Sequence, residues 1–136
     1  MGRQAWTPRG PAMSFLVMLG ILGGCQQSKP PVATSGDVET AQQEAQKEVE
    51  QARLEARRDI KSAVKVMGPN SRDVAVAKVT GTFDIAMAQA DGDHKVAMEK
   101  CMTVAPATKQ PCQAQADVDY QKAVASAKSN RVSGQQ

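Results

Sequence analysis

Apolar residues between Asp37 and Met67 recur at a spacing of eleven residues. Three series share this spacing: Val38, Val49 and Ile60; Ala41, Ala52 and Ala63; Ala45, Ala56 and Met67. Successive steps of three and four residues place these positions on one face of an α-helix, and an eleven-residue repeat keeps that face nearly straight. The pattern predicts a long alanine-rich helix over about 37–67, which packs on the rest of the chain or on copies of itself.

Charges and end signals support this helix. Its first half is mainly acidic and its second half mainly basic, which complements the helix dipole. Ser35 or Asp37 is expected to cap its start, and Gly68-Pro69 to end it. Three pairs are spaced for ion pairing along the helix, namely Glu44 with Lys47, Glu50 with Arg53, and Glu55 with Arg58.

A second element starts near Asn70, which is expected to act as a cap with Asp73 as its reciprocal partner. Between residues 74 and 87 the apolar positions alternate as in a strand, but they also step by three and four as in a helix. We predict a helix, because a lone strand would have no partner to pair with. The same stripe continues past Asp91-Gly92-Asp93, which favours one element over about 71–103.

A third helix is predicted over about 112–128. Its stripe consists of Cys112, Ala116, Tyr120, Ala123 and Ala127. In the preceding loop, Pro106 and Pro111 are expected to break any helix, because proline lacks the amide hydrogen that an inner helical turn needs.

Residues 1–24 have the layout of an export signal, with Arg3 and Arg9 before an apolar core at 12–22 and two small residues after it. The core has 11 residues, whereas a helix needs about 20 to cross a bilayer. Leu22-Gly23-Gly24-Cys25 then resembles the lipobox of bacterial lipoproteins. A plain secretory signal with a chance cysteine is the alternative.

The lipobox resemblance implies that residues 1–24 are removed and that Cys25 is acylated on its sulfur and its new amino group. Several acyl chains anchor a protein stably in a membrane. By resemblance to enteric lipoproteins, Gln26 is compatible with transfer to the outer membrane, so we expect a lipid-anchored envelope protein that faces the periplasm.

Removal of the signal leaves 112 residues with 15 lysines and arginines against 14 acidic residues. This balance and the predicted export argue against a nucleic-acid partner. The remaining ring-bearing residues are Phe83, His94 and Tyr120. A chain with this much alanine buries little apolar area per residue. We therefore expect slender helices rather than a globule with a deep catalytic pocket.

An exported protein meets an oxidising compartment, where Cys101 and Cys112 at the ends of the predicted hairpin most simply form a disulfide. His94 and Tyr120 lie at similar distances from that link and should meet across the hairpin. The predicted fold is all-α, with a long helix and a disulfide-stapled hairpin. The expected divisions are a signal peptide at 1–24, a lipidated cysteine and linker at 25–36, a helical domain at 37–128, and a flexible tail at 129–136.

The hairpin region also contains DHKVAMEKC at 93–101, KQPC at 109–112 and DYQKA at 119–123. This pattern is similar to one in small uncharacterised exported proteins of proteobacteria, although His94 stands where an aromatic residue is usual. The resemblance supports the hairpin and implies no chemistry.

The sequence offers one alternative for metal binding and one for catalysis. His94, Cys101 and Cys112, with Asp91 or Asp93, could hold a metal, but their spacing is not a usual zinc pattern. Asp91 and Asp93 could act as a paired acid, but no histidine-based triad or glycine-rich phosphate loop accompanies them. We therefore expect no metal, no cofactor and no enzymatic activity.

Two noncatalytic functions remain. In the favoured one, the chain is a structural or protein-interaction lipoprotein that contacts the membrane through Cys25 and an envelope protein, or a second copy, through helix 37–67. The alternative is an amphipathic stress-protective or lipid-surface-binding protein. The eleven-residue stripe resembles repeats of desiccation-protective and rod-like envelope proteins, but its many alanines favour weak membrane affinity and therefore the first function.

Overall fold

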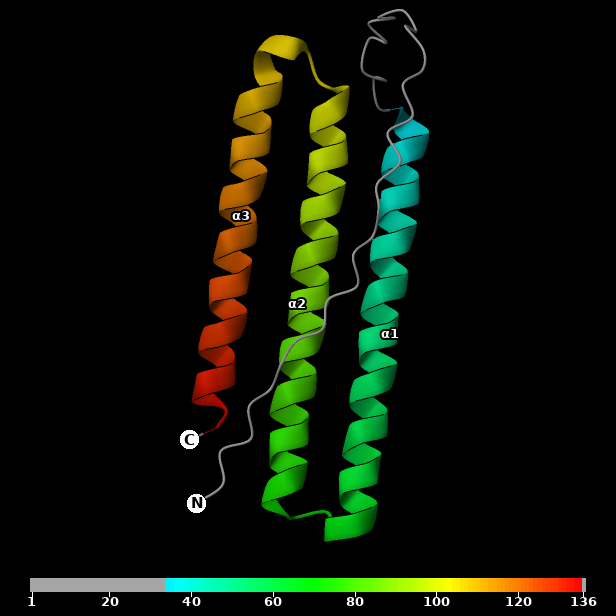
Figure 1. Cartoon of the computed structure of the whole chain (residues 1–136), viewed down its shortest axis with the longest axis vertical. Helices are drawn as coiled ribbons and strands as arrows, with labels where there is room; N and C mark the ends of the chain where they lie inside the picture. Colours follow the sequence, from blue (N-terminus) through cyan, green and yellow to red (C-terminus); the bar gives the residue numbers. More distant parts are fainter. Residues whose placement is uncertain (1–33, 136) are drawn as a thin grey trace, which may run out of the picture.

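The computed structural model describes residues 34–135, which form three helices: α1 (Ser35–Met67), α2 (Arg72–Thr103) and α3 (Pro106–Ser133). The helices run antiparallel, side by side, with α2 in the middle (Figure 1). α1 and α3 each pack on α2, and within the described residues they do not contact one another. The all-α fold is confirmed, as is a single helix across 74–87 and Asp91-Gly92-Asp93.

The alanine stripe of α1 packs on α2 through glycine. A Cβ placed on Gly92 would lie 2.7 Å from the Cβ of Ala45, and one placed on Gly81 would lie 2.5 Å from the Cβ of Ala56. The two glycines are therefore as far apart on α2 as the two alanines are on α1. Only a residue without a side chain permits such a close approach, so one of the eleven-residue series of α1 sets its register against α2.

α2 carries apolar residues on two opposite faces because it is the central helix. One face meets α1 through the buried Gly81 and Gly92. The other meets α3 through positions that include Phe83 and the buried Cys101. Because apolar residues lie on both of these faces, the apolar positions of residues 74–87 also alternate in the way that is typical of a strand.

The helix caps differ from the predicted ones. Thr34 caps α1, and the Asp37 carboxylate accepts hydrogen bonds from the Thr34 backbone N–H at 2.6 Å and from its hydroxyl at 2.9 Å. This bond lowers the pKa of Asp37. Ser71 rather than Asn70 caps α2, because its hydroxyl oxygen accepts the Val74 N–H at 3.3 Å. The predicted end of α1 is confirmed at Gly68, which has a φ of +84°.

α3 is longer than predicted at both ends. It begins at Pro106, where the missing amide hydrogen would have no helical partner in any case, and it includes Pro111. α2 ends at Thr103 and the helix is broken before Pro106, as predicted, whereas Pro111 lies inside α3. The prediction was therefore wrong for Pro111 alone. The predicted tail at 129–136 was also wrong in part, since α3 continues to Ser133.

The predicted linker at 25–36 overlaps α1, which already includes Ser35 and Gly36. The signal peptide at 1–24 and the lipidation residue Cys25 lie outside the described residues. None of the three described helices is long and apolar enough to span a membrane.

Candidate functional site

The disulfide joins α2 to α3 beside the loop between them. Cys101 and Cys112 have their Cα atoms 5.6 Å apart, and their sulfur atoms are at bonding distance. Cys101 is 2% exposed. The predicted pairing is confirmed, and it uses both sulfurs that the alternative metal set would need.

An aromatic contact lies about two turns along the hairpin from this disulfide. The rings of His94 and Tyr120 have their centroids 4.8 Å apart and are tilted by 32°. The predicted meeting of these two residues is confirmed. The disulfide between Cys101 and Cys112 fixes the register of α2 on α3. Because antiparallel α-helices have the same rise per residue, residues at similar distances from the disulfide along each helix lie opposite one another.

Two carboxylates complete the cluster, and the sequence analysis missed both roles. The Tyr120 hydroxyl donates to Asp91 Oδ1 at 2.7 Å, which raises the pKa of the Tyr120 phenol. His94 Nε2 lies 2.8 Å from Asp117 Oδ1. His94 and Tyr120 thus each have a carboxylate partner on the opposite helix, and the four residues connect α2 to α3 by polar contacts.

Asp91 and Asp93 are not brought together as a paired acid. They lie two residues apart on one helix, which turns their side chains to different faces. Asp91 accepts from Tyr120, whereas Asp93 lines a groove between α1 and α2. Within residues 34–135 there is no group of three histidine, cysteine or acidic side chains that could hold a metal, so the alternative metal set of His94, Cys101 and Cys112 is not assembled.

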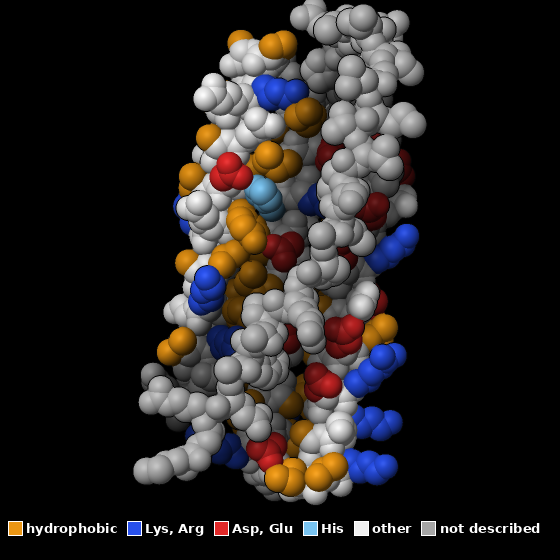
Figure 2. Space-filling view, in the orientation of Figure 1, with side chains coloured by type: hydrophobic (Ala, Val, Ile, Leu, Met, Phe, Trp, Pro, Cys, Tyr) orange, Lys and Arg blue, Asp and Glu red, His pale blue; other side chains and the backbone are white. Residues whose placement is uncertain are grey.

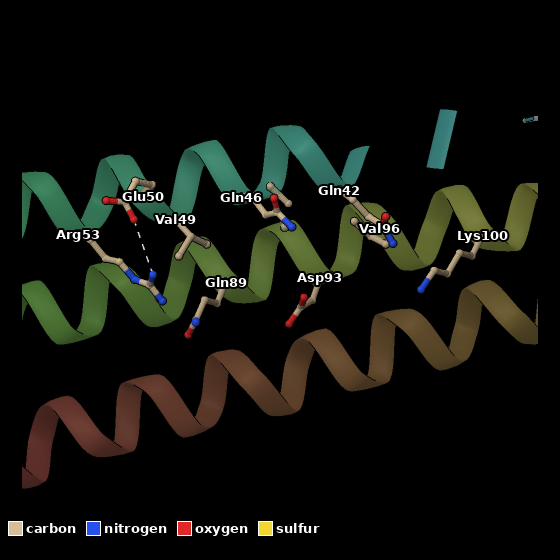
Figure 3. Close-up of a pocket in the computed structure, with 11 residues that line it drawn as sticks. Gln42, Gln46, Val49, Glu50, Arg53, Gln89, Asp93, Val96 and Lys100 are labelled. Carbon is tan, nitrogen blue, oxygen red and sulfur yellow. Dashed lines mark ion pairs between the residues drawn. The ribbon is translucent and has the colours of Figure 1, made fainter. Parts of the chain in front are cut away.

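The groove between α1 and α2 has a volume of about 770 Å³. Figure 3 shows Gln46, Val49 and Arg53 of α1 along one side, and Asp93 and Lys100 of α2 along the other. Its floor is the close contact of Ala45 with Gly92. The groove is open, and its lining contains no histidine, cysteine or serine. Its amide and charged side chains can bind polar groups.

One ion pair joins α1 to α2 on the other face of the layer. Lys95 donates to Glu44, which lowers the pKa of Glu44 and raises that of Lys95. Glu44 therefore does not form the predicted pair with Lys47. Of the three predicted pairs within α1, the structure contains the one between Glu50 and Arg53, at 3.7 Å.

A smaller hollow of about 260 Å³ lies near the end of α3. The Arg131 guanidinium stands over the Phe83 ring, 4.8 Å from its centroid. A cation over an aromatic face is stabilising. This contact holds the last turns of α3 on α2, in the region that was predicted to be a tail.

No family model, curated protein or solved structure matches this chain. The cluster around Tyr120 and the groove beside Gly92 are therefore interpreted from their own chemistry. The cluster joins α2 to α3, and the groove lies between α1 and α2.

Proposed function

We propose that this chain is a bacterial envelope lipoprotein, anchored through lipid on Cys25, whose helical layer has a structural or protein-interaction role without catalysis. The observation that carries the proposal is the Leu22-Gly23-Gly24-Cys25 motif directly after an apolar core of export-signal length. The periplasmic face of the outer membrane is the proposed location.

The arrangement of the helices supports a noncatalytic role. Three polar contacts connect one helix to another: Glu44 pairs with Lys95, Tyr120 with Asp91, and His94 with Asp117. An open layer exposes both of its faces, which gives a partner protein more surface than a closed bundle of the same three helices would.

The surface available to a partner is narrower than the sequence suggested. Helix 37–67 was expected to offer its alanine stripe to an envelope protein or a second copy. Ala41 and Ala56 of that stripe are buried in the contact with α2. Partner binding by α1 is therefore proposed for its outer edge, where Leu54 is exposed.

Metabolic labelling with palmitate in cells tests the anchor. We expect label on the wild-type chain, and accumulation of the uncut precursor when the lipoprotein signal peptidase is inhibited with globomycin. Cys25→Ala should abolish labelling, whereas the matched variant Cys101→Ala/Cys112→Ala should retain it. Processing that is insensitive to globomycin, or label that persists in Cys25→Ala, contradicts the anchor.

Circular dichroism separates this role from that of a stress-protective or lipid-surface helix. The chain without acyl groups should melt cooperatively as a helical protein in the absence of vesicles, because its alanine stripe already has a partner in α2. Helicity that develops only after anionic vesicles are added would favour the alternative function. Crosslinking in cells, followed by identification of the captured protein, then tests the partner.

A further inference from the structure

The end of the molecule formed by the turn between α1 and α2 has a different composition from the rest. Residues 57–78, here called the tip, carry six lysines and arginines and two aspartates, a net charge of +4. The remaining described residues, 34–56 and 79–135, carry eight basic and twelve acidic side chains, a net charge of −4. The layer is therefore polarised along its length.

The tip lies largely beyond the end of α3. Gly134, just after α3, reaches α2 at Val79, where a Cβ on the glycine would come within 3.0 Å of Val79 Cγ2. Because Gly81 faces Ala56, the position opposite Val79 on α1 is near Arg58. Among residues 34–135, the last turns of α1 and the first turn of α2 thus project as a pair with no third helix beside them, as Figure 1 shows at the lower end.

The cations of the tip are free to meet a ligand. All six are exposed, and within residues 34–135 none has an acidic side chain within ion-pair distance. These residues are Arg57, Arg58, Lys61, Lys65, Arg72 and Lys78. Figure 2 shows lysine and arginine side chains along the outer edge of α1 toward this end, while most of the acidic side chains in view lie higher.

Aliphatic side chains stand among these cations. Val66 is 75% exposed and Met67 is 57% exposed, and Val64 and Val76 are exposed nearby. Half of the eight large apolar side chains that are exposed in residues 34–135 therefore lie in this short segment. Exposed apolar groups that are ringed by cations are typical of a surface that contacts anionic lipid.

We propose that the tip docks on the surface of a bilayer that contains anionic phospholipid. Charge complementarity favours this occupant, since each lysine or arginine near such a surface contributes about 1 kcal/mol of binding free energy. A bilayer also accepts Val66 and Met67 without a shaped pocket. A second copy fits less well, because the twelve acidic side chains outside its own tip are spread over three helices among eight cations.

The negative charge of the residues outside the tip determines how the helices are oriented on the membrane. The rest of the described chain, at −4, is repelled by the surface that attracts the tip, so the helices are held end-on. The start of α1 lies at the opposite end, about 50 Å away for a helix of 33 residues. This contact does not require lipidation of Cys25, but if the proposed anchor is present, the protein bridges two membrane surfaces.

A vesicle-capture assay with the full chain as isolated from cells tests the inference. The protein is first incorporated into vesicles of phosphatidylcholine. Fluorescent acceptor vesicles, of phosphatidylcholine alone or mixed with phosphatidylglycerol, are then added and their capture is measured. We expect capture only of the mixed vesicles, weakened by added salt, which screens charges over about 10 Å at 0.1 M.

Lys61→Gln/Lys65→Gln should lower the affinity for the mixed vesicles about thirty-fold, from about 1 kcal/mol for each cation removed. The control Lys47→Gln/Lys100→Gln removes the same charge from outside the tip and should have no effect. Equal losses in both variants, or equal capture of neutral acceptors, would overturn the inference. Pairing of the donor vesicles with one another would overturn it in favour of a second copy.

The proposed anchor and the tip contact can fail separately. Loss of the protein from the donor vesicles would contradict lipidation of Cys25. Co-sedimentation of the released protein with mixed vesicles, and its dependence on Lys61 and Lys65, would still test the tip.

Discussion

Gly92 lies so close to Ala45 that a Cβ on the glycine would come within 2.7 Å of the alanine Cβ. The same contact recurs one repeat away, between Gly81 and Ala56. Glycine inside a helix normally costs about 1 kcal/mol relative to alanine. Here that cost is offset by the close approach of α1 and α2, which buries Ala41 and Ala56 in a chain with few large side chains.

Gly92→Ala should therefore destabilise the protein although it improves helix propensity. The added methyl group forces the helices apart, and overpacking of this kind typically costs about 1–3 kcal/mol. After the gain in propensity we expect a net loss of about 1 kcal/mol, seen as a fall of about 5 °C in melting temperature.

The matched control is Gly36→Ala in the first turn of α1, where the new Cβ would stand 3.5 Å from Thr34 Oγ1, an ordinary contact. This variant should keep or raise the melting temperature. Ala45→Gly combined with Gly92→Ala should recover part of the loss. A Gly92→Ala protein that is more stable than wild type would show that the two helices are not in tight contact.

The link between Cys101 and Cys112 should supply a large share of the stability. It closes a loop of about a dozen residues, for which the chain-entropy model gives roughly 3 kcal/mol. Cys101→Ser/Cys112→Ser should lower the melting temperature by more than 10 °C. A reductant should destabilise the wild type and leave the double variant unchanged. If the reductant has no effect on the wild type, the cysteines are not linked.

Tyr120 provides a spectroscopic test of the polar cluster, because it is the one tyrosine of the sequence. Its hydrogen bond to Asp91 raises the pKa of its phenol. A raised pKa means that the contact stabilises the fold below about pH 10 and that this contribution is lost as the pH rises through the folded-state pKa. Absorbance at alkaline pH should therefore show the phenol ionising above its usual range.

Asp91→Asn removes the charge while it keeps an oxygen that can accept the hydrogen bond. The phenol pKa should then move down toward its ordinary value. Asp93→Asn alters the same charge close to the Tyr120 ring but without a hydrogen bond to its hydroxyl, so it should change the phenol pKa much less. Equal pKa values in wild type and Asp91→Asn would contradict the contact.

The sequence predicted the helices and their pairing because those depend on periodicity and on one covalent link. A period near 3.6 residues identifies each helix, and the register set by Cys101 and Cys112 brings His94 to Tyr120. The exact helix ends are harder to predict, because several neighbouring side chains can act as the cap. Several possible acceptors lie within a few residues of each helix start, and the helices begin after Thr34 and Ser71.

Contacts between distant residues were the harder part of the site. Glu44 and Lys95 are 51 residues apart, so their pairing becomes visible only when the register of α1 on α2 is known. Gly81 considered alone argued against a helix over residues 74–87, because glycine has a low helix propensity. Its spacing of eleven residues from Gly92 matches that of Ala45 and Ala56, and this agreement was the signal that could have predicted the register.

We propose two separate roles for the three cysteines of the sequence, with lipid on Cys25 and a disulfide between Cys101 and Cys112. Mass spectrometry of the unreduced chain isolated from cells tests this most directly. The account predicts a protein that begins at Cys25, carries a diacylglyceryl group and an amide-linked acyl chain on that residue, and yields a peptide that contains Cys101 joined to Cys112. An unmodified Cys25, or a disulfide from Cys25 to either of the other cysteines, would contradict it.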